Sequence, residues 1–529
     1  MTCSDCSPTF HALKKLQEYK LFSRARRHEA PQVASERVEF IELISQGEKD
    51  LEGYEETIAR LQEMIVTLKN EQRSLNRQLG LAKHLMAPIQ KLPAEVLRQI
   101  FIAHGSINTI RPDKSATCDI PGFKVASICS HWRSIAIETT ALWNNITVQI
   151  RKDTKYDSCL PLTERLLELS QDSLLNIYIS VRLTTKTVTS TIPMFALLCA
   201  HANRWQCLEG SYDAPRPIAD ALASMRGRLD NLHTFRLLGA FEECSRWMEG
   251  ATKLHTLSVF HLDDRSTTIP WSQIVDLRAK EACVPRLAGS LQKLTNLSSL
   301  SVDYLRRPEA DDEKVISHSN LKALEIFLAI NEDEEEMQSL FESLTLPQLR
   351  SLCIEVENQY LTSQNSLTWM STELPSLISR SSALITYLSL KNVWMGTSDL
   401  ISLLRIMPVL TSLFLLESDY EGPNMSPMIN DQLLSRMYIL HQDQQPILTR
   451  LTFLYLKVSP RASFSIPMFV EMIHSRWKPA YLDDDEVACI ETVRLHVWDV
   501  AIPPNAIYPL TLLRKRGLDL LIKDMNGML

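Results

Sequence analysis

Glycine is scarce in this sequence: only 14 of the 529 residues are glycine. Loops that bind nucleotide phosphates need glycine where the backbone turns tightly, and neither GxGxxG nor GxxxxGK[ST] occurs in the chain. HExxH and GxSxG are also missing, and the CxxC formed by Cys3 and Cys6 has no second pair at zinc-ribbon spacing. We therefore expect no enzyme activity, no cofactor and no metal site.

An excess of basic charge is also missing. The chain carries 56 Lys and Arg against 63 Asp and Glu, a formal charge of −7, which disfavours binding to nucleic acid through phosphate contacts. No apolar run approaches the roughly 18 residues of a membrane span, and no apolar signal segment occurs at the N-terminus. The 11 cysteines are odd in number and widely spaced, as in a reduced protein. We expect a cytoplasmic or nuclear protein with no nucleic-acid or membrane partner.

Residues 1–36 show no sustained periodicity and are predicted to form a flexible tail, whereas residues 37–85 carry a heptad pattern. The first and fourth positions of each heptad, here called the seam, are mostly Ile and mostly Leu, respectively. This combination favours a parallel two-stranded coiled coil and predicts a homodimer. The alternative is that the same apolar residues pack against another part of the same chain. The two seam positions are occupied by Ile44, Leu51, Ile58, Ile65, Gln72 and Leu79, and by Gly47, Tyr54, Leu61, Leu68 and Leu75.

Pro88 is expected to end this helix, because proline lacks the backbone donor and clashes with the preceding turn. Residues 86–146 then read as a small all-helical unit. A short helix begins at Leu92-Pro93, a polar loop spans Asn108 to Asp119, and a second helix follows Pro121 and Gly122. Leu142-Trp143 closes the segment.

In order and spacing, Leu-Pro-x-Glu-Val-Leu-x-x-Ile-Phe, Val-Ala-x-Ile-Cys-x-x-Trp-Arg-x-Ile-Ala and Leu-Trp resemble the F-box, in the form common in fungal proteins. The loop from Ile102 to Ile120 is longer than in the minimal motif, and His131 stands where a basic residue is frequent. The resemblance implies that this segment binds the Skp-type adaptor of a cullin-RING ubiquitin ligase. The residues implied in adaptor binding are Leu92, Pro93, Val96, Leu97, Ile100, Phe101, Val125, Ile128, Cys129, Trp132, Ile135, Leu142 and Trp143.

Roughly one residue in seven is leucine, and residues 147–529 repeat the phrase L-x-x-L-x-L in degenerate form. Nine copies begin at residues 254, 274, 297, 321, 349, 385, 410, 451 and 490, with weaker copies near Leu174, Trp205 and Leu232. Several spacings match the 20 to 29 residues of a leucine-rich repeat, in which each strand and helix stacks on its neighbours. We predict an α/β leucine-rich-repeat-like solenoid; an ordinary α/β domain with leucine-rich strands is the alternative.

In such strands, the residues flanking the second leucine point away from the core and line the concave face. A strip of mixed charge and aromatic side chains suits a protein ligand, so we expect the target of the ligase to bind there. The residues predicted to bind it are Phe260, Arg278, Phe327, Tyr387, Lys391, Phe414, Tyr455, Lys457 and Arg494.

Together these patterns predict the substrate-recognition subunit of a Skp-cullin-F-box ubiquitin ligase. Its partners would be the Skp-type adaptor, the cullin and RING subunits reached through it, and a target protein. The alternative is a non-catalytic leucine-rich-repeat scaffold in which the F-box-like helices only cap the repeats and no ligase is attached.

Overall fold

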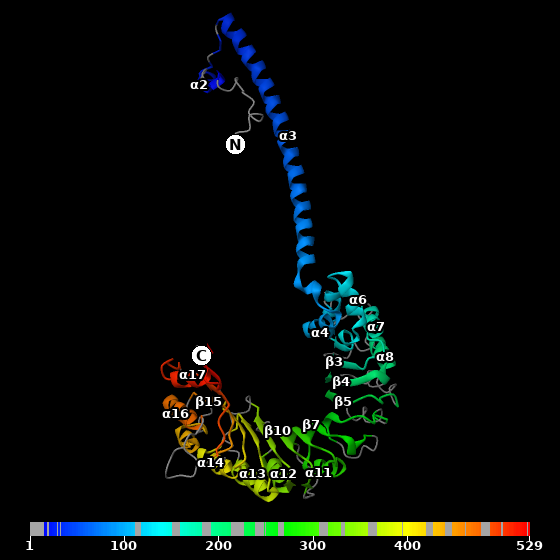
Figure 1. Ribbon diagram of the computed structural model, residues 1–529, viewed down its shortest axis with the longest axis vertical. Helices are drawn as coiled ribbons and strands as arrows, with labels where there is room; N and C mark the ends of the chain where they lie inside the picture. Colours follow the sequence, from blue (N-terminus) through cyan, green and yellow to red (C-terminus); the bar gives the residue numbers. More distant parts are fainter. Residues whose placement is uncertain are drawn as a thin grey trace. The chain divides into compact units, whose positions relative to one another are not determined.

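The computed structural model contains two compact units, residues Met1–Leu97 and Arg98–Leu529. Both α-helices and β-strands are present, as predicted, with one very long helix near the N-terminus and one large, mostly parallel sheet (Figure 1). Among the described residues, no helix combines the length and apolar character that crossing a lipid bilayer requires. The structure describes residues 15–17, 21–28, 30–31, 33–111, 118–150, 159–181, 192–212, 227–238, 248, 250–262, 269–305, 316–328, 334–357, 368–393, 395–418, 427–439, 447–460, 462–477, 487–498, 501–525 and 527–528.

The first unit is dominated by α3 (Ala34–Met86), a helix of 53 residues that contains the whole predicted heptad segment. It ends at Met86, and the 3-10 helix η1 (Pro88–Lys91) begins at the proline expected to stop it. Part of the expected N-terminal tail is helical, because α2 (Leu21–Arg26) precedes α3. An ion pair between Arg24 and Glu36, 2.7 Å long, joins this short helix to the first turn of α3.

The second unit contains a 16-stranded sheet in which spatial neighbours follow the order of the chain. All described pairings in it are parallel except the last, between β17 and β18. Two short strands, β9 (Ile316–Ser317) and β11 (Leu344–Thr345), form a separate pair. The large sheet consists of β1 (Ile107–Ile110), β2 (Asn145–Ile150), β3 (Leu175–Val181), β4 (Trp205–Tyr212), β5 (Thr234–Leu238), β6 (Thr256–His261), β7 (Asp276–Ala282), β8 (Ser299–Leu305), β10 (Ala323–Leu328), β12 (Ser351–Val356), β13 (Tyr387–Lys391), β14 (Ser412–Leu416), β15 (Phe453–Val458), β16 (Thr492–Val497), β17 (Asp519–Asp524) and β18 (Gly527–Met528).

Each of the nine L-x-x-L-x-L phrases runs into one strand, from β6 to β16, and the weaker copies lead into β3, β4 and β5. Burial alternates along these strands with a period of two. In β12, for example, Leu352, Ile354 and Val356 are buried, whereas Ser351 and Glu355 are partly exposed. The aliphatic residues of the phrase therefore face the protein interior, as predicted.

Helices connect many of the strands and lie along one face of the sheet, as α11 to α14 show in Figure 1. Proline in the first turn begins several of them, where its missing N–H costs no helical hydrogen bond. Asn430 and Ser465 cap the helices that follow them by accepting backbone N–H groups with their side chains. The helices are α7 (Leu160–Leu169), α8 (Ile192–Ala200), α11 (Val284–Lys293), α12 (Glu334–Ser343), α13 (Thr368–Ser381), α14 (Thr397–Arg405), α15 (Asp431–Met437), α16 (Ile466–Arg476) and α17 (Tyr508–Lys515).

The F-box-like segment differs from expectation in two respects. The polar stretch expected to be a loop begins with β1, whose Asn108 is fully buried, and β1 pairs with β2. The predicted end of the segment, residue 146, thus lies inside β2, and β1 is the edge strand of the large sheet. The expected second helix is two helices with a break at residues 127–129. The segment contains α4 (Ala94–His104), α5 (Pro121–Ala126), α6 (Ser130–Glu138) and the 3-10 helix η2 (Thr140–Leu142).

Candidate functional site

The face of the large sheet opposite the helices is the first candidate binding surface, and we call it the open face. It carries the polar and aromatic residues that alternate with the buried aliphatic ones, such as Arg278, Glu355, Phe414 and Tyr455. Because the strands are in register, these side chains form rows that run across the sheet. A partner lying on the open face would cross several strands at once.

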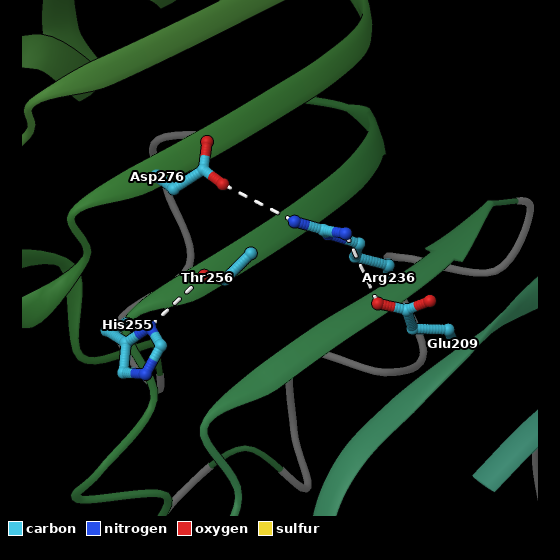
Figure 2. A network of polar contacts seen from close by, with 5 residues as sticks. All are labelled: Glu209, Arg236, His255, Thr256 and Asp276. Carbon is cyan, nitrogen blue, oxygen red and sulfur yellow. Dashed lines mark hydrogen bonds and ion pairs between the residues drawn. The ribbon is translucent and has the colours of Figure 1, made fainter. Parts of the chain in front are cut away.

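Cross-strand ion pairs occupy much of this surface. Figure 2 shows Arg236 of β5 lying between Glu209 of β4 and Asp276 of β7, with N–O distances of 3.2 and 3.5 Å. On β6, beside this group, Thr256 lies 3.1 Å from the ring Nδ1 of His255. Arg236 is not among the residues predicted from the sequence, because its strand comes from a weak copy of the repeat. These exposed pairs orient the side chains but stabilise the fold little.

A pocket of about 220 Å³ lies further along the same face. Arg278 forms two hydrogen bonds with the carboxylate of Asp303, at 3.1 and 3.2 Å, and its guanidinium lies 5.4 Å from the centre of the Phe327 ring. The pocket is smaller than the roughly 300 Å³ at which most cofactor sites begin. The lining carries three carboxylates and one guanidinium, and Lys391 pairs with Glu355 beside it, so one negative charge remains in excess, which suits a cationic side chain of a bound protein. Its lining consists of Arg278, Asp303, Tyr304, Phe327, Leu328, Glu355 and Glu357.

Next to this pocket along the strand order lies an aromatic cluster of four residues: Tyr387, Phe414, Phe453 and Tyr455. The Phe414 ring is at its centre, 5.0 Å from Tyr387, 4.7 Å from Phe453 and 6.1 Å from Tyr455. All four side chains remain partly exposed. Aromatic rings fixed by one another lose little entropy on binding, so this cluster is suited to contact a protein surface.

The predicted target-binding residues lie mainly on the open face. Lys391 pairs with Glu355 at 2.8 Å, between the pocket and the aromatic cluster. Lys457 lies 4.9 Å from the ring centre of Trp498, and Arg494 pairs with Asp519. The side chain of Phe260 lies outside the described part of the chain. Glu357, Trp498 and Asp519 are further contributors that were not predicted from the sequence, because none belongs to a recognised repeat phrase.

The F-box-like segment is the second candidate surface. Its exposed apolar side chains include Ile100 (40% exposed) and Ile128 (55%) in the second unit, and Val96 (42%) in the first. Pro93 is exposed too, and Leu92, Cys129 and Trp132 are partly buried, with Trp132 packed 4.9 Å from Phe101. The Cys129 Sγ accepts the Trp132 backbone N–H at the start of α6. The other predicted adaptor-binding residues are buried: Leu97, Phe101, Val125, Ile135, Leu142 and Trp143.

Trp143 is the centre of the segment's interior. Its indole Nε1 donates to the Ala136 carbonyl at 2.8 Å, and its ring lies 5.2 Å from that of Phe123. Gly122 lies against the same ring: a Cβ at this position would be 2.6 Å from two of its carbon atoms. The glycine is therefore needed for close packing here.

We expect Gly122→Ala to destabilise the F-box-like segment by about 1–3 kcal/mol, because the buried indole has to move. Gly80→Ala in α3 is the matched control, since no atom lies within 4 Å of its Cβ position. Removing a helical glycine there stabilises by up to about 1 kcal/mol. Hydrogen exchange should become faster in peptides covering residues 121–143 in the first variant and no faster around residue 80 in the second. If hydrogen exchange in residues 121–143 of Gly122→Ala is as slow as in the wild-type chain, the packing described here is wrong.

The described residues contain no group of three side chains that could hold a metal ion. Burial raises the pKa of the Cys199 and Cys207 thiols to about 12, so both stay protonated and are poor nucleophiles at neutral pH.

No protein-family model matches the sequence, and a search of curated proteins finds no match either.

Proposed function

We propose that this protein is the substrate-recognition subunit of a Skp-cullin-F-box ubiquitin ligase. In this proposal, the F-box-like residues 86–146 bind a Skp-type adaptor, which connects the chain to cullin and RING subunits. The sheet and its helices act as a leucine-rich-repeat-like solenoid that holds the target protein on the open face. Ubiquitin transfer is carried out by the other subunits.

The observation that carries the proposal is the order of apolar anchors in residues 86–146, together with the exposure of Val96, Ile100 and Ile128. The same short segment buries Phe101, Ile135 and Trp143 completely or nearly so. Exposed branched side chains beside a well-formed interior are costly to solubility unless a partner covers them. A helical adaptor surface is the partner that the resemblance implies.

The repeat region supports the second half of the proposal. Strands recur in chain order with helices on one face, which leaves the opposite face available to a protein ligand. A net negative pocket and an aromatic cluster lie on neighbouring strands of that face. A target with a cationic side chain near an apolar contact would match both.

One observation favours the alternative role as a scaffold. Strand β1 of the F-box-like segment is the edge of the large sheet, so the segment also covers the end of the strand array. A segment that serves only as such a cap needs no adaptor.

Co-purification of the full chain with a Skp-type adaptor distinguishes the two roles. We expect wild type to retain the adaptor and the Ile100→Ala/Ile128→Ala variant to lose it by a factor of 100 or more, since truncating an interface anchor typically costs about 2 kcal/mol. Leu384→Ala/Leu512→Ala is the matched control, because both residues are exposed and apolar but lie outside the segment. It should bind like wild type. Failure of the wild-type chain to bind the adaptor would support the scaffold.

A further inference from the structure

The exposed seam of α3 is not explained by the proposed function. From Leu51 to Leu79, the apolar heptad residues of this helix are between 38% and 61% exposed. Monomeric proteins rarely leave so long an apolar row uncovered. The seam consists of Leu51, Tyr54, Ile58, Leu61, Ile65, Leu68, Gln72, Leu75 and Leu79.

The chain itself covers part of the first turns of α3, although Ile44 of the heptad is still 54% exposed. Arg24 pairs with Glu36 and lies 5.3 Å from the centre of the Phe40 ring. Leu43 is buried, and Leu16 lies 3.7 Å from the Cβ position of Gly47. The continuous apolar row that a partner helix can match therefore begins at Leu51, after Gly47.

Charge along α3 is strongly polarised. Residues 34–56 contain eight acidic and two basic residues, whereas residues 57–86 contain two acidic and five basic ones. Two copies aligned in parallel would place acidic half against acidic half. Two copies aligned in opposite directions would place each acidic half against a basic half.

The residues beside the seam point to the same alignment. In a parallel coil, Asp50 would face Glu55 of the second copy, and the other flanking pairs would contain no opposite charges. In an antiparallel coil centred near Glu63, Glu55 faces Lys69 of the second copy, twice by symmetry. No like charges then meet in the flanking positions.

We propose that the protein forms an antiparallel homodimer through α3. The seam layers in this alignment are Leu51 with Leu75, Tyr54 with Gln72, Ile58 with Leu68, and Leu61 with Ile65, each pair joining the two copies. The one polar seam residue then meets a tyrosine hydroxyl. The choice of Ile and Leu along the seam favours a parallel coil on its own, but the charges beside it favour the opposite direction. This dimer does not depend on the proposed ligase role.

Charge reversal at Glu55 tests the direction of pairing, because the two alignments predict effects of opposite sign. Glu55→Lys places two cations together in the antiparallel dimer and should raise its Kd by about tenfold at low salt. In a parallel dimer, the same change would replace the repulsion from Asp50 by attraction and lower the Kd. Adding Lys69→Glu should restore the wild-type Kd in the antiparallel dimer. Glu56→Lys, one residue along on the outer side of α3, is the matched control and should change little.

Sedimentation equilibrium of the full chain measures these constants. A wild-type chain that remains monomeric, or a Glu55→Lys variant that dimerises more tightly, would overturn the proposal. Disulfide trapping gives a second readout: a mixture of Leu51→Cys and Leu75→Cys should link one variant to the other. Positions 51 and 75 are about 36 Å apart along a helix, so a parallel dimer would instead link each variant to itself. The unsubstituted chain shows the background from the natural cysteines.

Discussion

Replacing Arg476 with methionine is expected to lower the free energy of unfolding by about 3 kcal/mol or more. The Arg476 side chain is 0% exposed, at the end of α16. Its Nε donates to the Met437 carbonyl at 2.7 Å, and its two terminal nitrogens donate to the carbonyls of Leu448 and Ile447, both at 2.8 Å. Methionine fills a similar volume but leaves all three buried carbonyls without these donors.

The arginine also holds a strained turn. Leu448 has a φ of 59°, in the left-handed region that branched residues rarely adopt, and its carbonyl is one of the three acceptors. Burial lowers the pKa of Arg476 to about 9, so the guanidinium is still charged at neutral pH. Among the described residues no carboxylate pairs with it, and the three carbonyl oxygens accept its hydrogen bonds.

Urea denaturation of three Arg→Met variants checks this expectation. Arg405→Met, at an exposed position on α14, should change the unfolding free energy by less than about 0.5 kcal/mol. Arg380→Met should have an intermediate effect, because Arg380 is exposed but donates to the Phe341 and Leu344 carbonyls. A loss at position 476 no larger than at position 405 would show that the buried hydrogen bonds do not stabilise the fold.

Leu454→Asp is expected to unfold the strands around β15, whereas Tyr455→Asp should leave their stability nearly unchanged. Leu454 is fully buried beneath the sheet, between Leu413 and Val493 on the neighbouring strands. A carboxylate there would be buried without a partner, at a cost of several kcal/mol. Tyr455 lies on the open face at the edge of the aromatic cluster, where aspartate stays hydrated.

The two variants differ by one position and introduce the same residue, so each is the control for the other. Thermal unfolding should give a much lower Tm for Leu454→Asp alone. If the proposed function is correct, Tyr455→Asp should also lose the target protein while retaining the adaptor. Equal destabilisation by both substitutions would mean that Tyr455 is part of the core and that the open face is not a binding surface.

Much of the architecture follows from local patterns in the sequence. The phase of the phrase beginning at Leu451 places Leu454 inside and Tyr455 outside, because side chains alternate along a strand. The end of α3 at Met86 follows from Pro88, which lacks a donor and sterically excludes further helix. The placement of Arg278, Phe414 and Arg494 on one face needed only this alternation and the assumption that successive strands are parallel.

Other features were beyond prediction from local patterns. The apolar spacing continues through Ile128 and predicts one helix, but the backbone of Cys129 is extended and its thiol caps α6, so the chain forms two helices. Asn108 was predicted to begin a polar loop, but its side chain is buried and donates to the Leu142 carbonyl at 2.8 Å, 34 residues away. Cysteine is not one of the usual N-cap residues, and the partner of Asn108 is too distant in the sequence to leave a local signal.

The sequence by itself determined the spacing of apolar residues in each helix and strand. Because this spacing depends only on residues a few positions apart, it also determined which side chains face the interior. Only the tertiary structure decided which distant groups meet: the carbonyls around Arg476, the carboxylates around Arg236 and the rings around Phe414. Such contacts join residues on different strands and helices, so they depend on how the connections between the strands position one repeat against the next. Hydrogen bonding and packing then select one arrangement among many that share the same pattern.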